Sequence, residues 1–302
     1  MVAFLALVLA QAALGTWSSG RPTECADARG RATNVWEKAK SPELRRYCDL
    51  VASALSKLAG TAIMAEAALE EARSANAVLP GHAAPRVLEG RALASLGKLG
   101  EAFSALTAAK AIDARALDDA GSLLVWARVL ARTGHSEQAF SAYRALLPGA
   151  MALSSADRAC AAIEAGLVAM ARGPNAIDDA VAALRDGMRL AQDDAEPVAV
   201  LGLAVALDRR GDVDEARALL ADRVHGDPRT ALATGRAKEL LAVAQNERSA
   251  LVAVALEVSD VAGARAAWQD YLSAAPDGPW AGSVRARLAA LGVKRSATRG
   301  AR

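Results

Sequence analysis

Three histidines are the side chains best suited to acid–base or metal chemistry, and each stands at a predicted turn. His82 follows Leu-Pro-Gly, His135 follows Gly134, and His225 precedes Gly226. Zinc ligands must converge on one point, and a nucleophile needs a base within hydrogen-bond reach. Histidines on three separate turns, far apart along the chain, favour exposed loop positions without a catalytic or metal-binding role.

Other catalytic motifs are also missing from the sequence. It contains no glycine-rich phosphate loop, no HExxH and no CxxC. Asp193, Asp194 and Glu196 are interpreted as an acidic turn between helices rather than as a catalytic carboxylate pair. We therefore expect a protein that is not an enzyme, with no catalytic residues, no metal and no cofactor.

The cysteines predict one disulfide. Cys25 and Cys48 flank a short polar segment near the N-terminus, whereas Cys160 stands between alanines in a helical pattern. In an oxidising compartment the first two can pair, and the chain-entropy model gives such a closed loop about 3 kcal/mol of stabilisation. Cys160 is expected to be a small buried side chain.

The first fifteen residues, MVAFLALVLAQAALG, are typical of a secretory signal peptide. The apolar run is too short to span a bilayer, and no later segment is long enough to do so. Residues 16–42 then form an N-terminal segment joined by the disulfide to the first hairpin. The expected location is the periplasm or cell envelope. Because no Lys or Arg precedes the apolar run, a cytoplasmic protein with a buried first helix is the alternative.

The composition indicates an all-helical chain. Hydrophobic residues make up 53% of the sequence but aromatic residues only 4%, so the apolar content is mainly Ala, Leu and Val. Such a composition favours helices that pack closely through small side chains. The 36 Lys and Arg nearly balance the 34 Asp and Glu, which argues against a nucleic-acid partner.

Glycines and alanines recur at fixed offsets and reveal a helical repeat. In the stretch from Leu88 to Asp113, Gly90 allows close approach of two helices, Gly97 ends the first helix, and alanines lie on the second. The turn glycine returns as Gly134 and Gly211, with an intermediate copy at Gly173 in which two residues are inserted before the following alanine. Asp212 and Glu215 are spaced as a helix capping box.

These offsets resemble the tetratricopeptide repeat (TPR) family, in a degenerate form of the exported bacterial type. The resemblance covers residues 43–291 and implies an all-α fold, an α-solenoid of antiparallel helical hairpins in a right-handed superhelix. Residues after Pro276 predict a capping helix that ends at Gly292, followed by a basic, disordered tail over residues 292–302.

The resemblance also implies a concave groove lined by the first helices of successive hairpins. Arg91 and Arg128 then occupy matching places, where they could pair with carboxylates. An alternative is that the register is shifted and the apolar positions belong to the core. The predicted groove positions are Val87, Arg91, Leu124, Arg128, Ile163, Leu167, Met170, Leu201, Val205 and Asp208.

Two functions remain open from the sequence. The first is a non-catalytic scaffold or adaptor of the cell envelope that binds a peptide or helical segment of a protein partner in the groove. The alternative is a structural spacer or assembly subunit whose groove is filled by its own residues 16–40 and which binds through its edges. Neither function involves nucleic acid or a membrane span.

Overall fold

The computed structural model describes residues 17–18, 21–26, 41–59 and 62–299, and the chain divides into two compact units, Met1–Thr133 and Gly134–Arg302. The described residues are overwhelmingly α-helical, which confirms the predicted fold class. A short antiparallel ribbon joins β1 (Trp17–Ser18) to β2 (Arg21–Pro22), with Trp17 opposite Pro22. The predicted leader and Trp36 lie outside the described residues.

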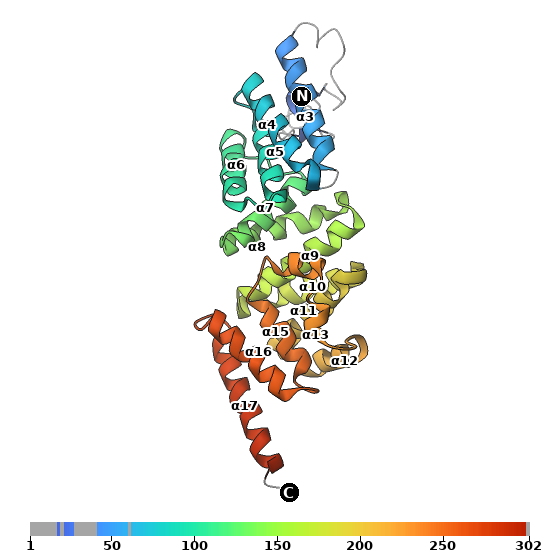
Figure 1. The fold of residues 1–302 in the computed structure, drawn as a ribbon, viewed down its shortest axis with the longest axis vertical. Coiled ribbons are helices and arrows are strands. Elements are labelled where there is room, and N and C mark those ends of the chain that lie inside the picture. Colours follow the sequence, from blue (N-terminus) through green and yellow to red (C-terminus); the bar gives the residue numbers. More distant parts are fainter. Residues whose placement is uncertain (1–16, 19–20, 27–40, 60–61, 300–302) are drawn as a thin grey trace, which may run out of the picture. The chain divides into compact units, whose positions relative to one another are not determined.

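The first unit is built from antiparallel helices, drawn in blue to green in Figure 1. In it α3 packs on α4, α4 on α5, and α5 on α6. After the ribbon its elements are η1 (Thr23–Cys25), α3 (Pro42–Leu58), η2 (Ala62–Met64), α4 (Ala65–Val78), α5 (Ala83–Ser95), α6 (Leu99–Ile112) and α7 (Ala120–Arg132).

Gly90 lets α5 and α6 approach closely, as predicted. A Cβ atom added at Gly90 would lie 2.5 Å from Cγ of Leu106, which is closer than two carbon atoms can pack. Gly97 then ends the hairpin's first helix with φ = 74°. The amide of Lys98 donates to the carbonyl of Leu93 at 2.9 Å, the bond that closes a Schellman turn. The spacing of the two glycines therefore encodes both the packing and the turn.

The predicted disulfide is present and attaches the N-terminal segment to α3. Cys25, at the end of η1, is bonded to Cys48 with a Cα–Cα distance of 5.6 Å. Both sulfur-bearing side chains are buried in a cluster that includes Val51, Ala54 and Leu88. The bridge therefore contributes to the core of the first unit as well as crosslinking it.

The second unit continues the helical pairs and adds shorter helices. In it α9 packs on α10, α10 on α11, α11 on α12 and α15, and α15 on α16. Its elements are α8 (Ser136–Leu146), η3 (Leu147–Ala152), α9 (Ser155–Ala171), η4 (Pro174–Ala176), α10 (Ile177–Leu190), η5 (Asp193–Ala195), α11 (Glu196–Arg210), α12 (Val213–Arg223), α13 (Pro228–Ala231), α14 (Gly235–Leu241), α15 (Glu247–Leu256), α16 (Val261–Ala274) and α17 (Ala281–Arg299).

The pair α9 and α10 repeats the geometry of α5 and α6. A Cβ at Gly166 would lie 2.4 Å from Cγ of Leu184, and Gly173 takes a positive φ of 105° at the turn. The two inserted residues are accommodated by η4, which follows Gly173 and precedes α10. The longer turn expected from the sequence is therefore a 3₁₀ turn, and the close packing of the two helices is retained.

Three local features differ from the sequence expectations. Asp212 does stand at the N-cap of α12, but its side chain makes no capping hydrogen bond there and accepts one from Arg210 instead. Glu215 pairs with Arg185 at 2.6 Å, so the predicted capping box is wrong. The last helix does not stop at Gly292, because α17 runs on to Arg299. The short helices α13 and α14, inserted between α12 and α15, were not expected.

The segment before α17 is fixed against the end of α9. Trp280 is 4% exposed, and its indole nitrogen donates to the carbonyl oxygen of Met170 at 2.8 Å. Pro279 packs against Gly173, where an added Cβ would lie 2.6 Å from Cβ of the proline. The indole thus adds a side-chain donor to a carbonyl at the end of α9, where the amide of Gly173 also donates to the same oxygen at 3.2 Å.

Candidate binding surfaces

The apolar positions predicted to line a groove are buried. They lie on α5, α7, α9 and α11, and none is more than 3% exposed. The seven residues are Val87, Leu124, Ile163, Leu167, Met170, Leu201 and Val205. The expectation that these side chains are exposed is therefore wrong. They belong to the core, as the alternative of a shifted register implies.

The burial has a physical cause in the second unit. The helices α9 and α11 are each covered on several sides, so that every residue from Ala159 to Met170 and from Val198 to Leu207 is buried. The inserted α14 contacts α9, and α15 contacts α11. Arg236 of α14 donates to the sulfur of Cys160 on α9 at 2.8 Å. Helices that in a simple hairpin stack would present one face to solvent are enclosed here.

The two predicted groove arginines are half-buried on α5 and α7. Burial lowers the pKa of Arg91, and the carboxylate of Asp119 opposes that effect. Asp119 is the N-cap of α7, where one of its oxygens accepts from the amide of Ser122 at 2.9 Å. Arg91 therefore faces a carboxylate of its own unit.

Asp208, the last predicted groove residue, belongs to an ionic cluster at the end of α11. Its carboxylate is bound by Arg287 of α17, with one nitrogen–oxygen distance of 3.0 Å. The same guanidinium also contacts Glu257 at 2.8 Å. Burial acts to lower the pKa of Arg287, but the hydrogen bonds to the two carboxylates outweigh it and raise that pKa. The cluster ties α17 to α11.

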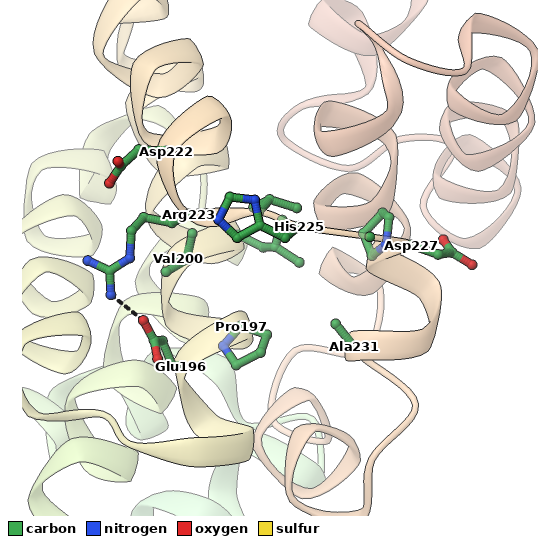
Figure 2. A pocket seen from close by; sticks show the side chains of 12 residues that line it. Glu196, Pro197, Val200, Asp222, Arg223, His225, Asp227 and Ala231 are labelled. Atoms are coloured by element: carbon green, nitrogen blue, oxygen red, sulfur yellow. Dashed lines mark hydrogen bonds and ion pairs between the residues drawn. The ribbon is translucent and has the colours of Figure 1, made fainter.

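An open cleft of about 340 Å³ lies where α11 begins and α12 ends. Figure 2 shows Pro197 and Val200 along one wall, with His225 over the middle and Ala231 at the far side. Val224 and the buried Pro228 add further apolar surface. The cleft therefore has an apolar lining that is reached from an edge of the second unit.

The rim of this cleft is charged. Arg223 of α12 forms an ion pair with Glu196 at the start of α11, and this contact raises the pKa of the arginine. Asp222 and His225 add polar groups, while Asp227 points away and caps α13 by accepting from the amide of Arg229 at 3.0 Å. Ligand pockets are usually apolar with a few polar groups, and protein interfaces likewise have an apolar core and a polar rim.

His82 is predicted to be an exposed loop histidine, but the structure places it half-buried and in contact with two other residues. Its Nδ1 lies 3.4 Å from Glu24, and its ring lies 5.4 Å from that of Tyr47. The hydroxyl of Tyr47 donates to the same carboxylate, and burial followed by the charge of Glu24 raises the pKa of that tyrosine. This polar group sits beside the disulfide. In the sequence, this polar group is indicated only by the predicted pairing of Cys25 with Cys48.

Metal-binding clusters and membrane-spanning helices are both absent from the described ranges. His, Cys, Asp and Glu side chains there form no group of three that could hold a metal ion. Within the same ranges no helix has the length and hydropathy to cross a bilayer.

The packing of the hairpins decides how the array is classified. Gly90 with Leu106 and Gly166 with Leu184 place a glycine of the first helix against a leucine of the second in two separate pairs, each followed by a turn glycine of positive φ. Consecutive helix pairs of this kind recur within each unit, and the second unit ends in α17. The array is TPR-like.

The likeness of this chain to known proteins lies in solved structures at low sequence identity. The sequence matches no protein-family model and no curated protein. Among solved structures, Naa15/Naa10 bound to HypK-THB gives a TM-score of 0.39 at 16% identity, covering 82% of this chain and 39% of that chain. The Cut9 and Hcn1 hetero-tetramer of APC/C gives 0.39 at 15% identity, covering 83% of this chain and 50% of that chain.

A third structure is TTC0263, a thermophilic TPR protein of Thermus thermophilus. It gives a TM-score of 0.24 at 18% identity, covering 82% of this chain and 99% of that chain. The present chain thus spans half or less of the first two structures and nearly all of the third.

Proposed function

We propose that this protein is a non-catalytic protein-interaction scaffold that binds a partner at an edge of its helical array. The observation that carries the proposal is the contrast between the first-helix positions, which are buried, and the apolar cleft shown in Figure 2, which is open. The sequence-derived groove has no exposed apolar surface to offer a peptide. Binding through an edge, the second of the two modes that the sequence left open, is the mode that the burial favours.

The cleft suits one apolar side chain of a protein partner. Pro197, Val200 and Val224 supply apolar contact without flexible side chains, so a partner residue loses little through ordering of the cleft. The ion pair of Arg223 with Glu196 lies on the rim, where it can exchange hydrogen bonds with a partner backbone. A cleft of about 340 Å³ falls at the small end of ligand sites, which fits one anchoring residue.

The proposed location is outside the cytoplasm, in the periplasm or cell envelope. Two observations support it: the apolar leader of the sequence and the Cys25–Cys48 disulfide. Disulfides persist in oxidising compartments and are rare among cytosolic proteins.

The test is site-specific crosslinking in the native cell. A photoreactive residue at His225, on the rim of the cleft, should give a discrete adduct, whereas one at the exposed Ser273 of α16 should not. The identified partner is then titrated against the purified protein. Ala231→Trp fills the cleft and should weaken binding at least tenfold, a loss of about 1.4 kcal/mol. Ala233→Trp, an exposed position two residues further on, is the matched control.

Equal binding by the two tryptophan variants would exclude the cleft as the contact surface. Adducts from Ser273 but not from His225 would place the partner elsewhere on the second unit.

A further inference from the structure

A second cleft, of about 380 Å³, lies at the other end of α11. It is bounded by the end of α11, the start of α12 and the face of α17 that follows Trp280. Arg209, Arg217 and Arg287 line it together with Asp208, Ser283 and Trp280. It shares no lining residue with the cleft of Figure 2.

Arg209 has an unsatisfied hydrogen-bond donor. The side chain is only 6% exposed, and its Nη1 contacts Glu247 at 2.6 Å. The guanidinium carbon lies 4.7 Å from the ring centre of Trp280 and 5.5 Å from that of Tyr271. Its Nη2 is buried and has no hydrogen-bond partner among the described residues. A buried donor without an acceptor is unfavourable, so an acceptor brought by a ligand would be favoured here.

The charges around the cleft determine what kind of acceptor fits. Arg209 is balanced by Glu247, and Arg287 is balanced by Asp208 and Glu257. Arg217 at the mouth is 67% exposed, and its nearest carboxylate, that of Asp214, is 3.8 Å away and fully exposed. Such an exposed pair contributes little, which leaves Arg217 able to bind an anion. A doubly charged group would be repelled by Asp208 and Glu257, whereas a single negative charge would be matched by Arg217.

We propose that this cleft binds one carboxylate group, whose oxygens accept from Arg209 and Arg217. A planar guanidinium matches the geometry of a carboxylate, and each charge-assisted hydrogen bond is stronger than a neutral one. Val284 and Trp280 offer apolar contact to the carbon atoms next to the carboxylate. The site is independent of the scaffold function proposed above, because the two clefts share no residue.

The experiment uses matched acids and amides as probes of the full mature chain. N-acetylglutamate N-methylamide represents an acidic side chain of a protein, and hydrocinnamate represents a free carboxylic acid. The glutamine analogue and hydrocinnamamide are their neutral counterparts. Binding is followed by the indole N–H resonances of Trp268 and Trp280, assigned with Trp→Phe variants. The acids should shift these resonances with a Kd on the order of 1 mM, and the amides should not.

Comparison of the two acids identifies the source of the carboxylate. Binding of both supports recognition of the carboxylate alone, and preference for one assigns the site to protein side chains or to free acids. Equal shifts with acids and amides, or no shift with either acid, would overturn the proposal.

Variants of the two arginines test the contacts directly. Arg217→Gln should weaken binding of the acids about tenfold, the effect of one charge-assisted hydrogen bond. Arg209→Lys keeps a positive charge beside Glu247 but removes the guanidinium, and should weaken binding at least as much. Arg248→Gln, an exposed arginine of α15 outside the cleft, is the control and should bind as the parent does. If Arg209→Lys does not fold, the affinity of Arg217→Gln for the acids tests the proposal by itself. Parental affinity in that variant would contradict the site.

Discussion

The indole nitrogen of Trp280 donates a hydrogen bond to the main-chain oxygen of Met170 at 2.8 Å, although 110 positions separate the two residues in the sequence. The bond joins the segment before α17 to the end of α9. The Met170 oxygen also accepts from the amide of Gly173 at 3.2 Å, so it keeps a main-chain partner without the indole. The indole nitrogen is buried with the Met170 oxygen as its acceptor.

Replacing Trp280 should destabilise the second unit in two steps. Trp280→Phe keeps the aromatic packing and removes one hydrogen bond to the Met170 carbonyl, which retains the amide of Gly173, for a loss of about 0.5–1.5 kcal/mol. Trp280→Ala also loses the packing and should cost about 3–5 kcal/mol. Urea unfolding monitored by circular dichroism measures both, and equal stability of the parent and the Phe variant would contradict the role of the hydrogen bond.

Truncating Leu167 tests its place in the core. The side chain is fully buried, so Leu167→Ala should lower the free energy of unfolding by about 2–5 kcal/mol. Ile63→Ala, at a position 87% exposed, is the control and should change stability by less than about 0.5 kcal/mol. A Leu167→Ala protein with the parental melting temperature would instead support an exposed groove.

Adding one methyl group at Gly166 should disrupt the close approach of α9 and α10. The new Cβ would lie 2.4 Å from Cγ of Leu184 and 3.1 Å from the carbonyl oxygen of Ala180, so main chain as well as side chain must move. We expect Gly166→Ala to cost about 1–3 kcal/mol. Gly282→Ala on α17 is the control, because an added Cβ there would have no atom within 4 Å. It should be neutral or stabilise by up to about 1 kcal/mol. The order of the two melting temperatures checks this.

The disulfide and the predicted leader together predict which thiols are free and where the purified protein begins. Alkylation under denaturing, non-reducing conditions should modify Cys160 alone, and mass spectrometry should find an N-terminus near Thr16. Reduction should then lower stability by about 2–4 kcal/mol. The Cys25→Ser, Cys48→Ser double variant, which cannot form the bridge, should melt like the reduced protein. Three alkylated thiols with an intact leader would indicate a cytoplasmic protein.

The pKa of Tyr271 predicts that the protein loses stability at alkaline pH. Burial raises its pKa to about 12, with Glu247 adding to the effect and Arg209 opposing it. An unfolded tyrosine has a pKa of about 10. Since the folded pKa is the higher, the contribution of the neutral phenol is complete below about pH 10 and is lost as the pH rises to about 12. Tyr271→Phe should therefore lose less stability across this window than the parent, as measured by urea midpoints, and an equal decline would rule out this residue as the cause.

The hairpins could be predicted because their determinants are local. Gly90 and Gly97 lie on one helix and its turn, and the inserted residues after Gly173 are visible as a changed spacing. The groove could not be predicted in the same way. Whether Leu167 is exposed depends on helices whose residues lie far downstream, and the short α13 and α14 carry only weak local signals. Their N-caps, Asp227 and Thr234, are the signals that could have revealed them.

The two candidate clefts were also beyond sequence reasoning. The helical register predicts Asp208 as a groove residue, but its partner in the structure is Arg287 on the last helix. The unsatisfied nitrogen of Arg209 arises from the positions of Glu247, Tyr271 and Trp280 on three other segments. Long-range charge pairing of this kind leaves no periodic pattern in the sequence.

The contact between Trp280 and Met170 also sets an order for events during synthesis. At about 5–20 residues per second, a ribosome needs roughly 6–22 s to make the 110 residues that separate the two partners. Throughout that interval the end of α9 is without the indole that packs against it, so this contact forms only after the earlier helices of the second unit have been made.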